Sequence, residues 1–197
     1  MRAITGDPPN LGFQIRELSA ETWPDFVRIM EKHGGVWGGC WCVAFHQTDR
    51  QLKQMTTPHR QYKEELVRAN RAHAALVYEG ADVAGWCQFG SPTELPGRMG
   101  RLPRLGLDPP DWRLTCFFVD RDRRREGVAQ AALAGAIQLI KEYRGGTVDG
   151  YPIAIAGKSQ SSSFLWGGTA SMFVDAGFKE IARLGTSKLV MRKIVKP

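Results

Sequence analysis

The stretch VDRDRRREGVAQAAL, residues 119–133, places four arginines within five positions and then becomes apolar at Gly127. Like charges at this spacing repel one another unless an anion or water compensates them. The apolar residues that follow recur at helical spacing, which predicts a helix from about Gly127 to the Gly145-Gly146 pair. The first turn of a helix has unpaired N–H groups and partial positive charge, and Gly127 has no side chain to block them. We therefore expect an anion, such as a phosphate, to bind at this turn.

A strand is predicted immediately before the basic turn. WRLTCFFV, residues 112–119, is rich in aromatic and β-branched side chains, which indicates a strand buried on both faces. Residues 92–110 contain five prolines and three glycines, which predicts a long surface loop or flap. The order of loop, strand, basic turn and helix therefore places the expected anion site at the end of a central strand.

The remaining sequence predicts further helices and strands around this centre. Helices are expected over residues 23–34, 57–70 and 164–176, and strands over 13–18, 74–78, 83–89, 151–155, 178–184 and 188–194. GGVWGGCWCVAFH, residues 34–46, has no clean period and predicts an ordered aromatic loop. We expect a single domain over residues 13–195, preceded by an N-terminal extension over residues 1–12.

The charge of the chain also favours an anionic partner. The formal net charge is +7, and residues 98–125 contain eight arginines against four aspartates. A phosphate-bearing cofactor or a nucleic acid would suit this surplus, but the sequence has no recognisable DNA-reading helix or base-stacking motif. There is also no membrane-spanning run and no apolar signal-peptide centre, so we predict a cytoplasmic protein that binds neither membrane nor nucleic acid.

The four cysteines are expected to be free thiols. They are Cys40, Cys42, Cys87 and Cys116. A reducing compartment disfavours disulfides, and the single C-x-C pair lacks a second pair at zinc-site spacing. We therefore predict no metal site.

Residues 119–129, VDRDRRREGVA, resemble the acetyl-coenzyme A signature of the GNAT superfamily of N-acetyltransferases, whose core pattern is R/Q-x-x-G-x-G/A. Here the pattern runs from Arg124 to Ala129, after a predicted strand and before a long predicted helix. Farther along, MFVDAGFKEIARL and KLVMRK are similar to the superfamily's closing helix and paired strands. The resemblance implies an α/β (α+β) fold with a mixed, mostly antiparallel, V-shaped central sheet flanked by helices.

The resemblance also implies a coenzyme site and acetyl-coenzyme A as cosubstrate. Backbone N–H groups at the start of the helix would hold the pyrophosphate, and the end of the preceding strand would pair with the pantetheine arm as an added strand does. The wedge between that strand and the one expected at residues 151–155 would hold the thioester. The implied coenzyme-binding residues are Phe118, Val119, Arg124, Arg125, Glu126, Gly127, Val128 and Ala129.

The implied reaction is direct attack of a primary amine on the acetyl thioester in a ternary complex. Many relatives have a tyrosine four residues before the Gly-Phe pair of the closing helix, where it protonates the leaving thiolate; here Phe173 occupies that place. The family's asparagine, earlier in that helix, is also missing from residues 164–167. Residues 161–163, Tyr151 or water are the candidate replacements. The alternative to an enzyme is a non-catalytic acyl-coenzyme A sensor. Phe173 suggests this alternative because it replaces the tyrosine that would donate the proton.

His46, at the end of the aromatic loop, is the candidate general base because its ordinary pKa suits neutral pH. A packed histidine without a catalytic role, a water chain, Glu94 and Asp111 are the alternatives. Aromatic residues predict either an acceptor pocket or core; they are Trp37, Trp41, Phe45 and Trp86, with core favoured for Trp86. Acidic residues are scarce in these loops, so we expect a small or apolar amine acceptor. A homodimer is compatible with the sequence.

Overall fold

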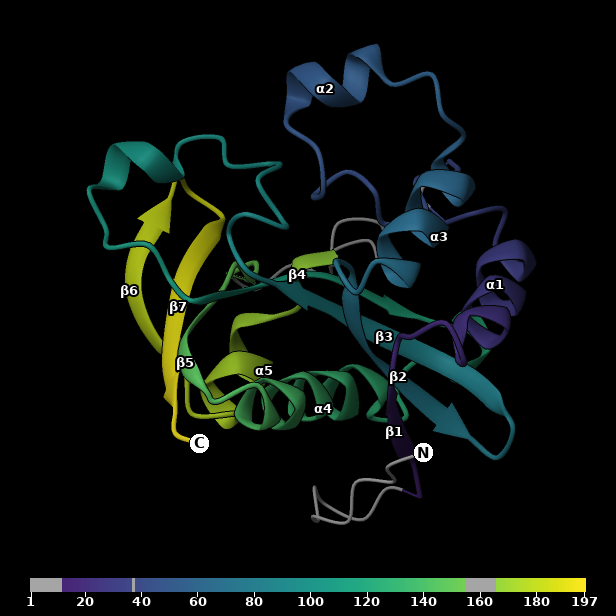
Figure 1. The fold of residues 1–197 in the computed structure, drawn as a ribbon. Coiled ribbons are helices and arrows are strands. Elements are labelled where there is room, and N and C mark those ends of the chain that lie inside the picture. The colour runs from purple at the N-terminus through teal and green to yellow at the C-terminus, as the bar shows by residue number, and fades with distance from the viewer. Residues whose placement is uncertain (1–11, 37, 155–165) are drawn as a thin grey trace.

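The computed structural model describes residues 12–36, 38–154 and 166–197, which form one seven-stranded sheet with helices around it (Figure 1). The strands are β1 Gln14–Glu17, β2 His73–Glu79, β3 Asp82–Gly90, β4 Trp112–Val119, β5 Gly146–Gly150, β6 Lys179–Leu184 and β7 Lys188–Val195. The helices are α1 Trp23–Lys32, α2 Asp49–Gln54, α3 His59–Arg68, α4 Val128–Glu142 and α5 Ala170–Asp175, with the 3₁₀ turns η1 Leu102–Leu105 and η2 Arg121–Arg123.

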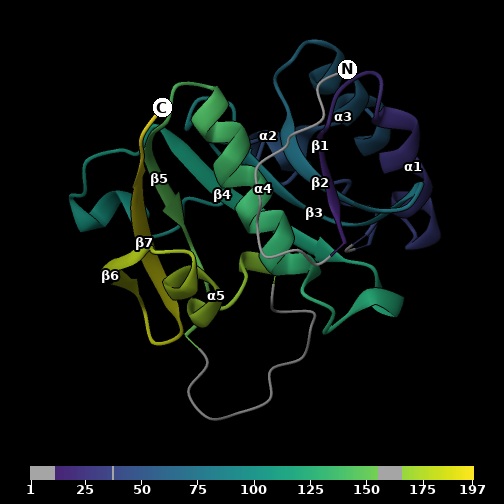
Figure 2. The same cartoon turned by 90° about the horizontal axis from the view of Figure 1, so that it is seen from below.

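The sheet has the order β1-β2-β3-β4-β5-β7-β6, and all neighbouring strands are antiparallel except β4 and β5. Helices α4 and α5 pack on one face, and Figure 2 shows α4 lying across it. Helices α1 and α3 cover the other face (Figure 1). Each face has its own apolar core, because residues that alternate along a strand point to opposite sides. The predicted mixed, mostly antiparallel sheet is confirmed.

The long helix α4 buries the face that the sequence predicts. Its residues Leu133, Ala136 and Ile140 are buried against the sheet. Gly135 permits a closer approach than any other residue would, since a Cβ there would lie 2.7 Å from Ile15 Cγ2. No helix within the described ranges is long and apolar enough to cross a bilayer.

The strand after α4 begins earlier than the sequence predicts. We expected it at residues 151–155, but β5 covers residues 146–150, and within the described part of the expected span only Ile153 forms isolated bridges. The sequence of β5, GTVDG, is poor in strand-forming residues, so its propensity gives no signal. Tertiary contacts stabilise it instead: the Arg192 guanidinium of β7 donates hydrogen bonds of 2.6 and 2.9 Å to the buried Asp149 carboxylate.

Two helices also differ from the prediction. The helix expected over residues 164–176 is the shorter α5, which follows Gly168 with a left-handed φ of 75°; residues 164 and 165 lie outside the described part of the chain. Helix α2 was not predicted. It begins with a capping box, in which the Thr48 side chain accepts from the Gln51 N–H and the Gln51 side chain accepts from the Thr48 N–H.

Candidate active site

Strand β4 changes its pairing halfway along. On one side, Gln88 of β3 faces two residues of β4, Thr115 and Cys116, which together form a β-bulge. On the other side, in the described part of the chain, the ladder with β5 covers only Trp112–Leu114. From Thr115 onward, β4 therefore presents main-chain N–H and C=O groups that no described strand pairs with, toward the space where β4 and β5 diverge.

A cleft of about 900 Å³ opens beside this free edge. Its walls come from the end of β4, the turn before α4, the first turn of α4, the loop after α1 and the start of α5. Of the eight predicted coenzyme-binding residues, seven line the cleft: Phe118, Val119, Arg124, Arg125, Gly127, Val128 and Ala129. Glu126 is not among the lining residues, and its carboxylate lies 3.7 Å from Arg123.

The first turn of α4 faces this cleft and has no side-chain cap. Gly127 precedes it in the left-handed conformation, with φ 83° and ψ 3°. Arg125 is also left-handed, with φ 69°, a conformation that costs a non-glycine residue about 1 kcal/mol. The helix N–H groups that lack a capping side chain thus meet the solvent of the cleft, as an anion site requires.

Salt bridges divide the four arginines of the run into two groups. Arg123 turns away from the cleft and pairs with Glu79 and Glu126. The other three line the cleft, and within the described residues no carboxylate forms an ion pair with them. These three are Arg121, Arg124 and Arg125. Their charge is therefore available to an anion in the cleft.

The aspartates beside the run are bound by α1 instead of the arginines. Lys32 Nζ lies 2.7 Å from Asp120 Oδ2 and 2.9 Å from Asp122 Oδ2. Burial would raise the pKa of Asp120, but hydrogen bonds from Lys32 and from the Asp122 amide outweigh burial and lower that pKa. Asp120 is therefore ionised at neutral pH, and it ties α1 to the turn without neutralising the arginines of the cleft.

This cleft lies in the part of the chain that has a family match. Residues 27–148 match the profile of the acetyltransferase (GNAT) family, which includes β4, the arginine turn and α4. The chain belongs to the GNAT family. Members of this family are transferases that use acyl-coenzyme A donors, so the GNAT assignment gives the cleft a ligand class.

Solved structures share the GNAT fold. The coenzyme A-dependent acyl-homoserine lactone synthase BjaI has a TM-score of 0.54 and 17% identity, over 94% of this chain and 84% of that one. The ribosomal-protein-S5-alanine acetyltransferase of Vibrio fischeri has a TM-score of 0.54 and 12% identity, over 99% and 97% of the chains. An N-acetyltransferase of Staphylococcus aureus Mu50 has a TM-score of 0.51 and 16% identity, over 93% and 99%. These identities show the fold alone, and no curated protein matches the sequence.

Phe173 of this GNAT protein is a core residue. It is fully buried, and its ring makes edge contacts with Phe117 and Phe178, at centroid distances of 6.0 and 5.0 Å. Its edge also lies against the backbone of β5, since a Cβ on Gly150 would be 2.0 Å from Phe173 Cε1. The side-chain hydroxyls that line the cleft belong to Thr169 and Ser171, and they lie 3.1 Å from each other.

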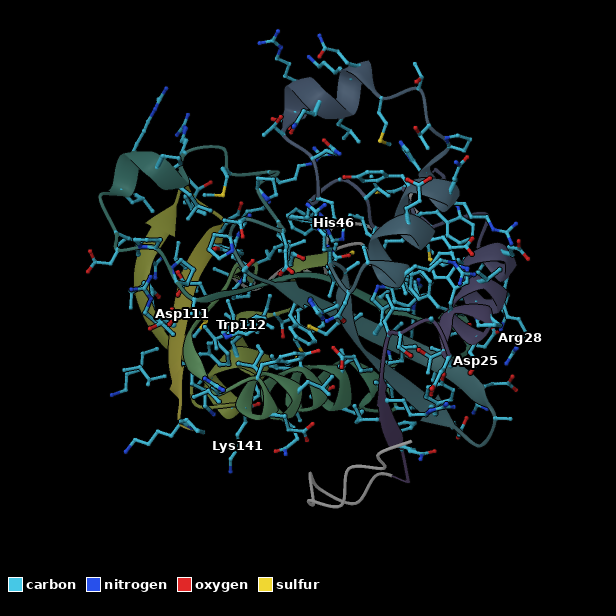
Figure 3. The ribbon with its side chains drawn as sticks, in the orientation of Figure 1. Asp25, Arg28, His46, Asp111, Trp112 and Lys141 are labelled. Carbon is cyan, nitrogen blue, oxygen red and sulfur yellow. The ribbon has the colours of Figure 1, made fainter. Side chains whose placement is uncertain are left out.

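His46 lies on the sheet face opposite α4, within a chain of buried polar side chains (Figure 3). Its Nδ1 lies 3.0 Å from the Glu94 carbonyl oxygen and its Nε2 lies 2.9 Å from Lys63 Nζ. Burial and the positive charge of Lys63 hold the pKa of His46 well below its ordinary value. The ring is therefore neutral, with Nδ1–H donating and Nε2 accepting, and both nitrogens are engaged.

The polar chain continues from His46 to the bulge of β4. Lys63 Nζ donates to Gln88 Oε1 at 2.8 Å, and Gln88 Nε2 donates to Thr115 Oγ1 at 3.2 Å. Burial lowers the pKa of Lys63 to about 8. This lysine was not predicted from the sequence, although it stands three and four residues before Leu66 and Val67, in the buried row of α3. A lysine in an apolar stripe was the available signal.

The other candidate groups have structural partners. Glu94 accepts hydrogen bonds from Ser91 and lies 3.5 Å from His73, and Asp111 accepts from the Thr147 amide at 2.7 Å. Tyr151 is buried, and its hydroxyl accepts from Arg113 Nε at 3.3 Å. Trp86 is fully buried, as the core interpretation predicts, and Trp41 and Phe45 are also mostly buried. Trp37 and residues 161–163 lie outside the described residues.

Proposed function

We propose that this protein is an acetyl-coenzyme A-dependent N-acetyltransferase that acts on the primary amine of a small acceptor. The observation that carries the proposal is the conjunction, around one cleft, of the uncapped start of α4, three arginines that form no ion pair with a described residue, and the free edge of β4. Coenzyme A has the matching parts: phosphates for the helix start and the arginines, and an amide-bearing arm for an open strand edge.

The acyl group would then lie where β4 and β5 diverge, next to the bulge at Thr115 and Cys116. When the amine attacks the carbonyl carbon, negative charge develops on the carbonyl oxygen, and a free N–H of β4 can donate to it. Because Phe173 offers no proton, we propose that the coenzyme thiolate leaves without a phenol donor and is protonated from the solvated cleft, where the hydroxyls of Thr169 and Ser171 lie.

The role that we propose for His46 follows from its contacts. With both ring nitrogens engaged, it serves as a positioning residue: it orients Lys63, Lys63 orients the Gln88 amide, and that amide holds the bulged Thr115. The proton of the acceptor amine would then leave through water. If His46 itself removes that proton, as predicted from sequence, its contact with Lys63 must first break.

Calorimetric titration with acetyl-coenzyme A and with free coenzyme A tests the donor site. Both should bind, and Gly127→Glu should abolish binding because it adds bulk and negative charge where phosphate is expected. The matched control is Gly80→Glu in the β2–β3 turn, where φ is 59° and a Cβ would meet nothing within 4 Å. If both variants bound acetyl-coenzyme A equally well, the assignment of the phosphate site to the start of α4 would be wrong.

A thiol-release assay with a panel of primary amines then separates an enzyme from a sensor. An N-acetyltransferase should release coenzyme A thiol at a rate that depends on the amine. Binding without amine-dependent release would instead favour the acyl-coenzyme A sensor.

A further inference from the structure

Where β5 ends, a cluster of basic and aromatic side chains lies next to the expected acyl group, on the sheet face that α1 and α3 cover. We call this cluster the acceptor rim, and its members are Phe45, Arg98, Arg113, Tyr151, Trp166 and Lys188. Figure 1 shows the loop between β3 and β4, which contributes Arg98, beside β6 and β7 on the side of the sheet away from α4.

Hydrogen bonds close one side of the rim. The Arg113 guanidinium donates to the carbonyl oxygens of Leu95 and Gly97 as well as to Tyr151. The Gly97 amide donates to the Phe45 carbonyl oxygen at 2.8 Å, and this packing is so close that a Cβ on Gly97 would lie 2.2 Å from the Gln47 carbonyl oxygen. Arg98, which follows Gly97, is thereby held at the rim.

The other side of the rim joins it to the cleft. The rings of Phe45 and Trp166 lie 5.5 Å apart, and Lys188 Nζ lies 4.0 Å above the Trp166 ring. Lys188 bridges to Ile153, whose amide donates to the carbonyl oxygen of Gly168 in the cleft wall. Backbone contacts through Ile153 therefore connect Lys188 to Gly168, in the cleft wall.

The rim and the core beneath it have an excess of positive charge. Among the described residues, four of their basic side chains take part in no ion pair: Lys63, Arg98, Arg113 and Lys188. Lys63 and Arg113 are almost completely buried, where the interior screens their charge less than water does. Burial and the nearby positive charge of Arg98 lower the pKa of Lys188. Such a field opposes a cationic acceptor and favours an anionic group.

We propose that the acceptor amine also carries an acidic group, a carboxylate or a phosphate, that binds Lys188 and Arg98, while Trp166 and Phe45 contact its apolar part. This inference rests on the proposed N-acetyltransferase function and specifies its substrate class. The same positive field lowers the pKa of the acceptor's ammonium group, which favours the neutral amine that attack requires. The site thus needs no carboxylate base next to the amine.

Matched acceptors test the proposal in the thiol-release assay. The carboxylate arm compares L-phenylalanine with its methyl ester and with 2-phenylethylamine, and the phosphate arm compares phosphoethanolamine with ethanolamine. In at least one arm, the acidic compound should have a kcat/KM at least tenfold above that of the partner that lacks the acidic group, as expected for a charge-assisted contact. The arm that shows this preference identifies the acidic group.

Variants then assign the preference to the rim. Lys188→Met should reduce kcat/KM for the acidic compound at least tenfold and leave kcat/KM for the partner without the acidic group within about twofold. Lys188→Arg should retain the preference, which separates charge from packing. The control is Lys141→Met on α4, which Figure 3 shows on the other side of the sheet from His46. Coenzyme binding should be unchanged in all three.

The two proposals fail differently. If amines without an acidic group are acetylated as well as acidic ones, or if Lys188→Met preserves a preference for acids, the acidic-acceptor proposal is overturned while the acetyltransferase stands. If acetyl-coenzyme A binds but no amine in the panel increases thiol release, the enzymatic proposal itself is contradicted, and the acceptor proposal falls with it.

Discussion

At the scale of single residues, two buried basic residues, Lys63 and His73, differ in the charge of the groups around them. Lys63 has neutral hydrogen-bond partners, His46 and Gln88, and burial lowers its pKa to about 8. Burial would also lower the pKa of His73, but hydrogen bonds and negative charge from Glu17 and Glu94 raise it to about 9. The two residues should therefore influence stability in opposite directions as the pH rises.

For Lys63, stability should increase with pH. Its pKa is lower in the folded chain than the ordinary 10.5, so the cost of burying the charge is fully present below pH 8 and disappears as the pH approaches 10.5. The free energy of unfolding of the wild type, minus that of Lys63→Met, should increase by roughly 2 kcal/mol between pH 7 and pH 10. Urea unfolding at both pH values measures this, and a constant difference would show that folding does not lower the pKa of Lys63.

For His73, stability should decrease with pH. Its folded pKa lies above the ordinary 6.5, so its contribution is complete below pH 6.5 and is lost as the pH rises through about 9. The difference between the wild type and His73→Gln should shrink by roughly 2 kcal/mol between pH 6 and pH 10. NMR titration of the imidazole provides an independent check, and an apparent pKa near 6.5 would refute the ion-pair account.

At the scale of elements, α5 and β5 restrict what Phe173 can do. The ring lies between Gly150, Phe117 and Phe178 without exposure, so a hydroxyl added to it would be buried among apolar groups. Phe173→Tyr should destabilise the fold by about 1–3 kcal/mol and should not raise the rate of acetyl transfer. Thermal unfolding and the thiol-release assay measure both effects. A faster, equally stable variant would mean that position 173 does reach the departing thiolate.

Local patterns in the sequence predicted some elements well and others not at all. Trp112–Val119 is a strand over its full predicted length because aromatic and β-branched residues specify it. β5 was misplaced because its stability comes from Asp149 and Arg192, which are far apart in the sequence. The helix start at Gly127 could be predicted from a local motif. The acceptor rim could not be predicted, because its six residues come from separate parts of the sequence between Phe45 and Lys188.

At the scale of the whole molecule, the net charge of +7 and the three arginines of the cleft should make donor binding sensitive to salt. Raising sodium chloride from 0.05 to 0.5 M should weaken acetyl-coenzyme A binding by roughly tenfold. Arg124→Gln should weaken binding at low salt and flatten this dependence. Arg123→Gln should do neither, because Arg123 is paired with Glu79 and Glu126. Calorimetry at several salt concentrations measures both, and identical effects of the two variants would contradict the division of the arginines.

The divergence of β4 and β5 has a further consequence for the solubility of the protein. Unpaired backbone on an edge strand of a sheet can pair with a strand of another chain, which leads to aggregation. Here the exposed backbone lies in an interior slot that is sealed at one end by the Trp112–Leu114 ladder. A narrow, flexible ligand such as the pantetheine arm can enter this slot from its open end. A strand of another protein chain cannot pair with β4 there as it could with an edge strand of the sheet. The fold thus offers main-chain recognition to a ligand while hiding it from other proteins.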